Sequence, residues 1–191
     1  MPTIAVKPVG AGTNELLGAG ALYIGGSIDA WSTTPGTLLG TTKGGCSFTD
    51  NAEFRDREAD GDYVPMKGAK DLIKIRPQLT INLLEVSTAI LEDIYGGMAT
   101  TSGTNFDQVT RKFDLSSSYQ DVIYWIGARR DGKNIAIELK NVIGNGPLIW
   151  NPTKDEEVIQ NIVLEAHGDP ATFDITDVST YPYNIWVEKA A

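Results

Sequence analysis

The sequence predicts a mainly β protein, arranged as a β-sandwich or partial barrel with one short helix on its flank. Glycine supplies 20 of the 191 residues, an enrichment typical of a chain with many turns. Apolar and polar residues alternate along several short segments, which is the period of strands, and only one segment has helical spacing. A chain of this length buries about 70% of its unfolded surface, which is enough for one domain with a substantial core.

Three regions are expected along the chain. Residues 1–18 carry prolines and glycines with little periodicity, so they predict an extended arm that becomes ordered only when it has a partner. Residues 19–170 hold the alternating segments and form the β domain. Residues 171–191 form a C-terminal extension with a short strand at 184–187.

The first strand is expected at 19–24, followed by loops around Trp31 and a long strand from Gly44 to about Arg57. The even-numbered positions of the long strand include Phe48 and Phe54, whereas its odd-numbered positions are all polar. This polar face consists of Ser47, Thr49, Asn51, Glu53, Arg55 and Arg57. It must contact water or a hydrated channel.

A second long strand is expected over residues 70–86, with an interruption of pairing at Pro77. Proline cannot donate a ladder hydrogen bond, so this part of the strand belongs at an edge or a bulge. After the proline, apolar residues share one face of the strand: Leu79, Ile81 and Leu83.

The segment Thr88–Tyr95 is the predicted helix. Ser87 or Thr88 is a suitable N-cap, and apolar residues occur at 90, 91, 94 and 95. Gly96-Gly97 follows where a C-cap glycine is common. A narrow apolar stripe of this kind suits a helix that packs on the side of a sheet.

The C-terminal half predicts a loop at 98–105, a strand at about 108–115 and then a hairpin. Its two strands, 122–126 and 135–139, are joined across Asp131-Gly132, a dipeptide that suits a type I′ turn. A last strand is expected at 158–166, where residues 158, 160, 162 and 164 face opposite to residues 159, 161, 163 and 165.

Charge and cysteine content exclude several classes of protein. The formal net charge is −9, from 25 acidic against 16 basic residues, which disfavours a protein that grips nucleic-acid phosphates. No apolar run approaches the roughly 20 residues of a membrane span, and no signal peptide is recognisable, so membrane insertion is not expected. The single cysteine, Cys46, cannot form an internal disulfide, which fits folding in a reducing cytoplasm.

Motifs that suggest chemistry do not meet the requirements of that chemistry. Asp56-x-Glu58-x-Asp60-Gly61 resembles the start of a calcium loop, but Lys67 stands where a bidentate glutamate is needed. His167 and Cys46 together are too few for a usual zinc site. The sequence therefore predicts a structural protein, without enzymatic activity, metal or cofactor.

The segment Gly40–Gly68 combines Gly40-Thr-Thr-Lys-Gly-Gly45, the two-faced strand, Asp60-Gly61 and Lys67-Gly68 in this order. In this order of elements the chain resembles the tail tube proteins of long-tailed bacteriophages. The resemblance covers about residues 15–170 and includes Pro77–Glu85, the predicted helix, Asp155–Ile159 and Val163–Pro170.

The resemblance implies stacked hexameric rings with a continuous inner β-barrel, through which viral DNA passes into the host without specific binding. The partners that it implies are further copies of the chain, a tape measure protein, a tail terminator and distal tail or baseplate proteins. The implied location is the virion tail, assembled in the bacterial cytoplasm.

On this hypothesis, charged residues of the long hairpin face the lumen or the next ring. These residues are Glu53, Arg55, Arg57, Glu58, Asp60, Asp62 and Lys67. An acidic lumen would repel DNA, and the loop 57–67 would contact the next ring.

Two alternatives remain open at this point. One is a monomeric carbohydrate-binding or other ligand-binding β-sandwich that stacks its ligand on tryptophan: Trp31, Trp125, Trp150 or Trp186. The other is the inner tube of a contractile injection machine, which by resemblance shares the fold.

Overall fold

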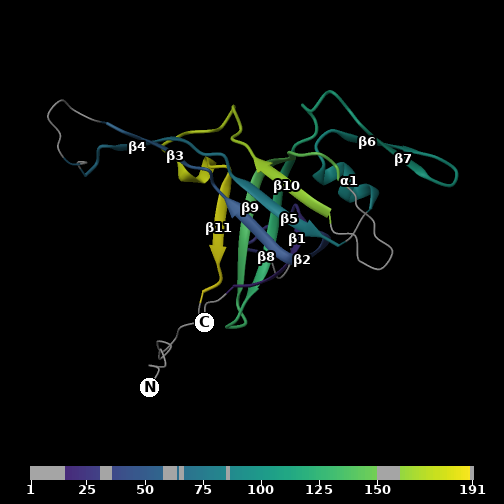
Figure 1. The fold of residues 1–191 in the computed structure, drawn as a ribbon, viewed down its shortest axis with the longest axis horizontal. Helices are drawn as coiled ribbons and strands as arrows, with labels where there is room; N and C mark the ends of the chain where they lie inside the picture. The colour runs from purple at the N-terminus through teal and green to yellow at the C-terminus, as the bar shows by residue number, and fades with distance from the viewer. Residues whose placement is uncertain are drawn as a thin grey trace, which may run out of the picture.

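A computed structural model describes residues 16–30, 36–57, 64, 67–84, 87–149 and 160–189. Its centre is a closed, antiparallel barrel of six strands in the order β10-β5-β2-β1-β8-β9, completed by pairing of β9 with β10 (Figure 1). The strands are β1 Leu16–Ile24, β2 Thr37–Thr49, β5 Gln78–Leu83, β8 Gln120–Arg129, β9 Asn134–Gly144 and β10 Gln160–Ala166. The mainly β prediction is confirmed, and the sheet closes into a barrel instead of dividing into a sandwich.

The core lies inside the barrel and follows the predicted alternation. In β5 the residues Leu79, Ile81 and Leu83 are all fully buried, as expected from their shared face. Ile162 and Leu164 of β10 are buried opposite them in the same cluster. Each such side chain contributes about 1.5–3 kcal/mol through removal of apolar surface from water.

Trp125 is the largest fully buried side chain and determines which residues can stand beside it. Gly20 of β1 and Gly127 of β8 are paired across the two strands. A Cβ atom added at Gly20 would lie 2.5 Å from Trp125 Cε2, and one at Gly127 would also overlap the indole ring. The two glycines therefore make the space that the tryptophan fills.

The helix α1 spans Thr88–Ile94 and packs on the flank of the barrel (Figure 1). Ser87 is its N-cap, and the Ser87 side chain accepts a hydrogen bond from Ile90 N at 3.2 Å. The helix buries Ile90, Leu91 and Ile94, the face that the sequence predicted.

Two ribbons, each of two strands, project from opposite sides of the barrel (Figure 1). One pairs β3 (Glu53–Asp56) with β4 (Lys70–Lys74), and the other pairs β6 (Met98–Ser102) with β7 (Asp107–Arg111). The expected loop at 98–105 was therefore wrong for residues 98–102, which form β6 and pair with β7, whereas residues 103–105 lie in the turn between the two strands.

The predicted strand from Gly44 to Arg57 is two strands, because the chain turns between β2 and β3. Asn51 has φ 46°, a left-handed conformation that asparagine tolerates better than most residues. Its side-chain amide donates to the Arg76 carbonyl at 2.9 Å, and Arg76 N donates to the Asp50 carbonyl at 2.8 Å. The second predicted long strand, 70–86, is also divided. Its two parts, β4 and β5, are separated at residues 75–77, where Pro77 was expected to interrupt pairing.

The hairpin of β8 and β9 is confirmed, although its turn differs from the prediction. Of Asp131 and Gly132 only the glycine has a positive φ, at 81°, so the turn is not type I′. Asp131 instead stabilises a longer turn by accepting hydrogen bonds from Arg129 Nη2 at 2.8 Å and Lys133 N at 3.2 Å.

A seventh strand, β11 (Tyr183–Val187), pairs with the first half of β9. The strand expected at 184–187 is thus present within the predicted extension 171–191. Strand β9 changes partner at Asn141, which has φ 48°: residues 135–139 pair with β11, and residues 142–144 pair with β10. Of the predicted arm 1–18, only residues 16–18 are described, and they belong to β1.

Candidate interaction surfaces

The polar face of the β3–β4 ribbon is held together by ion pairs. Arg57 Nη2 lies 2.8 Å from Asp71 Oδ1, and Arg55 Nη2 lies 3.5 Å from Asp71 Oδ2. Glu53 pairs with Lys74 at 3.8 Å. The sequence grouped Glu53, Arg55 and Arg57 correctly as exposed side chains, but it did not reveal that β4 supplies charges that compensate them.

The other predicted site residues lie at or beyond the end of this ribbon. Lys67 is exposed in the turn that leads into β4. Glu58, Asp60 and Asp62 lie outside the described residues. Within residues 53–57 and 70–74 there are four basic and three acidic side chains, so the described part of the ribbon is not an acidic surface.

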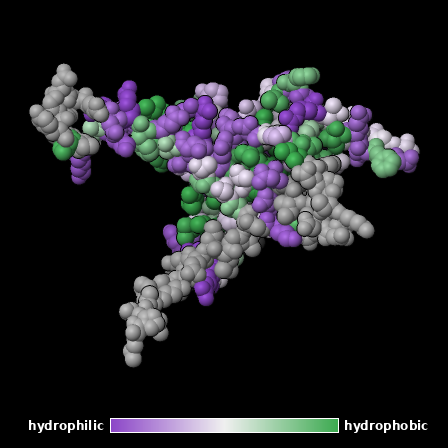
Figure 2. Space-filling view, viewed as in Figure 1, coloured by the Kyte–Doolittle hydropathy of each residue, from purple (hydrophilic) through white to green (hydrophobic). Residues whose placement is uncertain are grey.

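The opposite face of the ribbon is partly apolar. Phe54 of β3 stands opposite Leu72 of β4, and both are exposed. Lys70 Nζ lies 5.3 Å from the centre of the Phe54 ring and pairs with Asp56 at 4.0 Å. Figure 2 shows hydrophobic residues among the charged ones along the β3–β4 ribbon.

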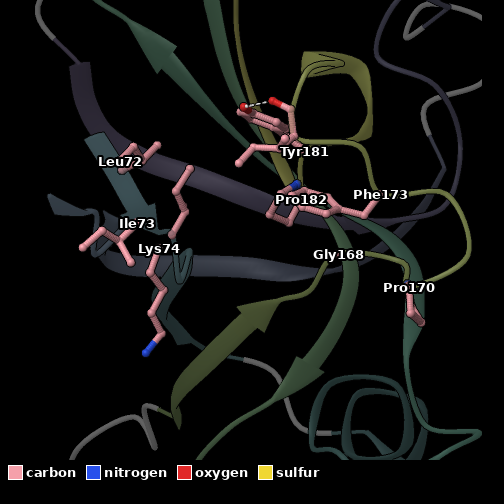
Figure 3. A pocket seen from close by; sticks show the side chains of 10 residues that line it. Leu72, Ile73, Lys74, Gly168, Pro170, Phe173, Tyr181 and Pro182 are labelled. Atoms are coloured by element: carbon pink, nitrogen blue, oxygen red, sulfur yellow. Dashed lines mark hydrogen bonds between the residues drawn. The ribbon is translucent and has the colours of Figure 1, made fainter. Parts of the chain in front are cut away.

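An apolar groove of about 360 Å³ lies between β4 and the segment 168–182 (Figure 3). On one side it is lined by Leu72 to Ile75, and on the other by Phe173, Ile175 and Tyr181. Lys74 is the charged side chain among its lining residues. The groove therefore combines an apolar floor with one ammonium group.

The C-terminal wall of this groove is built by local hydrogen bonds. Tyr181 Oη donates to the Ile175 carbonyl at 2.9 Å, as Figure 3 shows. Thr180 Oγ1 donates to the carbonyl oxygens of Asp174 and Asp177. Hydrogen bonds from the backbone and hydroxyl of Thr176 lower the pKa of Asp174. These bonds hold the exposed Ile175 in a defined position.

Among the described strands, β11 forms an edge of the sheet, and its two faces differ. Ile185 and Val187 are exposed, whereas Trp186 and Asn184 turn toward Glu138 of β9. Glu138 is only 8% exposed, and its Oε2 accepts hydrogen bonds from Asn184 Nδ2 and Trp186 Nε1, both at 2.8 Å. This carboxyl group therefore adds side-chain hydrogen bonds to the backbone pairing that joins β11 to β9.

The four tryptophans proposed for ligand stacking have different environments. Trp125 is fully buried in the core, so it cannot stack on a ligand. Trp186 lines a groove of about 440 Å³ together with Asn134 and Glu188. Trp31 and Trp150 lie outside the described residues.

Cys46 lies half-buried against the core, and burial raises the pKa of its thiol to about 11 from an ordinary value of 9.0. At pH 8 we expect iodoacetamide to alkylate it about 100-fold more slowly than a free cysteine, because the thiolate fraction falls tenfold for each unit of raised pKa. Mass spectrometry of timed samples would measure this rate, with the guanidinium-unfolded protein as control. A folded-state rate equal to that of the unfolded chain would contradict this burial.

His167 follows β10 in a position that suits a structural role. Its ring meets Tyr119 edge-on with centroids 5.2 Å apart, and its Nε2 lies 3.8 Å from Glu165 Oε1. Within the described ranges, no three His, Cys, Asp or Glu side chains are grouped so that they could hold a metal ion. Neither of the described helices has the length and hydrophobicity to cross a membrane.

Comparison with known proteins does not place the chain in a family: no family model matches it, and no curated protein matches it.

Proposed function

We propose that this chain is the repeating subunit of a bacteriophage tail tube, in which stacked, sixfold rings form a conduit for viral DNA. The observation that carries the proposal is that a small closed barrel has several surfaces suited to contact with other copies. A free strand edge, two projecting ribbons and an apolar groove all display groups that the described fold itself leaves exposed.

Two strand edges that the described part of the chain leaves unpaired suit head-to-tail assembly. In the part of the sheet ordered β11-β9-β8-β1-β2, strand β11 is one end, and residues 37–40 of β2 form the other because β5 pairs with β2 only from Thr42 onward. Unpaired strand edges can be satisfied by another copy. Two different edges make a heterologous contact, which closes into a ring when the rotation between copies allows it.

The charge of the chain agrees with a conduit for DNA. DNA carries one negative charge about every 1.7 Å along its axis, and a surplus of nine negative charges on each subunit opposes adhesion. The charged side chains of the β3–β4 ribbon form ion pairs with one another. The ribbon therefore suits a contact between protein subunits better than an acidic lining of the lumen. On this proposal the ribbon and its loop contact the next ring, and the further partners are a tape measure protein, a tail terminator and distal tail or baseplate proteins of the virion.

Negative-stain electron microscopy of the concentrated protein tests the proposal. Hollow rods with a regular axial repeat are expected. The variant Ile185→Lys/Val187→Lys should remain folded but form no rods, because charges on an edge strand prevent pairing with another copy. Val178→Lys is the control, since Val178 is also apolar and is more exposed than Ile185 and Val187 but lies in the 3₁₀ turn Val178–Thr180 and not in β11.

The groove at Trp186 favours one second candidate, a monomeric glycan-binding module. An aromatic wall beside amide and carboxylate groups is a common arrangement for binding sugars. Monodisperse particles that bind a glycan, with binding lost in Trp186→Ala, would support this candidate against the tube. Rods from the parent protein would exclude glycan binding as its main role.

A further inference from the structure

The tip of the β6–β7 ribbon carries an isolated aromatic side chain. A four-residue turn joins the strands, closed by a hydrogen bond from Gly103 N to the Phe106 carbonyl at 3.1 Å. Phe106 is 88% exposed at the end of this turn, beside Asp107. A ribbon of five residues extends about 17 Å, so the tip stands well clear of its own barrel.

The base of the ribbon is supported, because Met98 is buried in the core cluster and Val109 packs against it, but residues 101–108 toward the tip are all exposed. In the described part of the chain, β6 and β7 pair only with each other, and their sheet is separate from the barrel. An isolated two-stranded ribbon is marginally stable in water. A second surface that packs against the ribbon would supply the missing burial.

The apolar groove between β4 and the segment 168–182 has the complementary properties. Its walls are apolar on both sides, which suits an inserted phenyl ring. Lys74 lies in its lining, and among the described residues its ion pair is the long contact of 3.8 Å to Glu53. A phenyl ring next to a carboxylate at the tip thus matches an apolar groove next to an ammonium group.

We propose that the ribbon tip of one copy inserts Phe106 into this groove on the next copy, with Asp107 meeting Lys74. The β6–β7 ribbon points away from the β3–β4 side of the same molecule, so the contact joins different copies (Figure 1). The ribbon tip and the groove are different surfaces of the molecule. Their contact is therefore heterologous and repeats from copy to copy. The inference rests on the proposed self-assembly and specifies one of its contacts.

Substitution of the aromatic anchor is the first test. Phe106→Ala should weaken self-association at least about 30-fold in sedimentation velocity, as expected for a central aromatic anchor of an interface. Phe113→Ala is the matched control: Phe113 is 105% exposed but follows β7 at the base of the ribbon, away from the tip. Equal effects of the two substitutions, or none from Phe106→Ala, would overturn the contact.

A charge exchange tests the second half of the contact. Asp107→Lys alone and Lys74→Glu alone should each weaken association about five- to tenfold, and the two together should restore it. Circular dichroism of each variant would establish that the barrel remains folded. Failure of the double variant to recover would overturn the pairing of Asp107 with Lys74.

Disulfide trapping separates this inference from the tube proposal. In a Cys46→Ala background, protein with Phe106→Cys is mixed with protein carrying Ile175→Cys, in the groove, and oxidised; Phe113→Cys replaces Phe106→Cys in the control. A cross-link specific to the first mixture is expected. Rods without this cross-link would overturn the contact and leave the tube, whereas the cross-link without rods would leave the contact and overturn the tube. Absence of both would overturn both.

Discussion

Replacing Trp125 with alanine is expected to lower the free energy of unfolding by about 3–5 kcal/mol, the range for removal of a large aromatic side chain from a core. Trp125 is fully buried, and its ring covers the paired Gly20 and Gly127. Because two glycines line the space, no neighbouring side chain at these positions can fill the resulting cavity. Guanidinium unfolding followed by circular dichroism would measure the change.

The variant Trp125→Phe is the control for this prediction. It keeps a ring over the two glycines and removes an indole N–H that has no hydrogen-bond partner within the described part of the molecule. Its effect should be clearly smaller than that of alanine. If both substitutions left the unfolding midpoint unchanged, Trp125 would not occupy the core of the barrel.

Replacing Glu138 with alanine is expected to cost about 2–4 kcal/mol and to release β11 from the barrel. Glu138 Oε2 accepts hydrogen bonds from both Asn184 and Trp186, so its loss leaves two donors of β11 without their acceptor. A hydrogen bond to a charged group contributes about 1.5–3 kcal/mol, and because both donors are only half-buried, water replaces part of each lost bond. Hydrogen exchange should therefore accelerate most strongly in Tyr183–Val187, and unfolding should begin at lower denaturant concentration.

Glu138→Gln distinguishes the hydrogen bonds from the charge. Glutamine offers a carbonyl oxygen at nearly the same position, so it can accept from both donors. We expect it to retain most of the protection of β11. Equal loss in the alanine and glutamine variants would show that the negative charge, and not the acceptor, holds the strand.

Local signals in the sequence were sufficient for the elements that depend on near neighbours. The helix was predicted from Ser87 and the spacing of its apolar residues, and both features hold in α1. Alternation predicted the buried face of β5, and the two strand-like runs on either side of Asp131-Gly132 predicted the pairing of β8 with β9. These patterns are readable because a period of 3.6 or 2 residues records which face is buried.

The failed predictions depend on contacts between distant segments. The turn at Asn51 is stabilised by Arg76, which is 25 residues away. No nearby residue indicates this turn, so the alternating residues on both sides of it were predicted to form one strand. Strand β6 has a polar sequence rich in Thr and Ser, and only its pairing with β7 makes it a strand. The role of Glu138 was missed because a single Glu in an apolar strand carries no sign of the partners supplied by β11.

The same division applies to the candidate surfaces. Exposure of Glu53, Arg55 and Arg57 followed from alternation, but their compensation by Asp71 and Lys74 required the register of β3 on β4. The apolar groove joins Leu72–Ile75 to residues about a hundred positions later in the chain, and no local pattern connects them.

The sequence by itself determined that the protein is mainly β, where its helix and central hairpin lie, and that its net charge is strongly negative, because composition and short periods encode these properties directly. The tertiary structure alone decided that the sheet closes into a barrel, that β11 is locked by Glu138, and which apolar side chains remain at the surface. These features arise from pairing register and packing between segments far apart in the chain, where the free energy of each contact depends on residues that no single window of sequence contains.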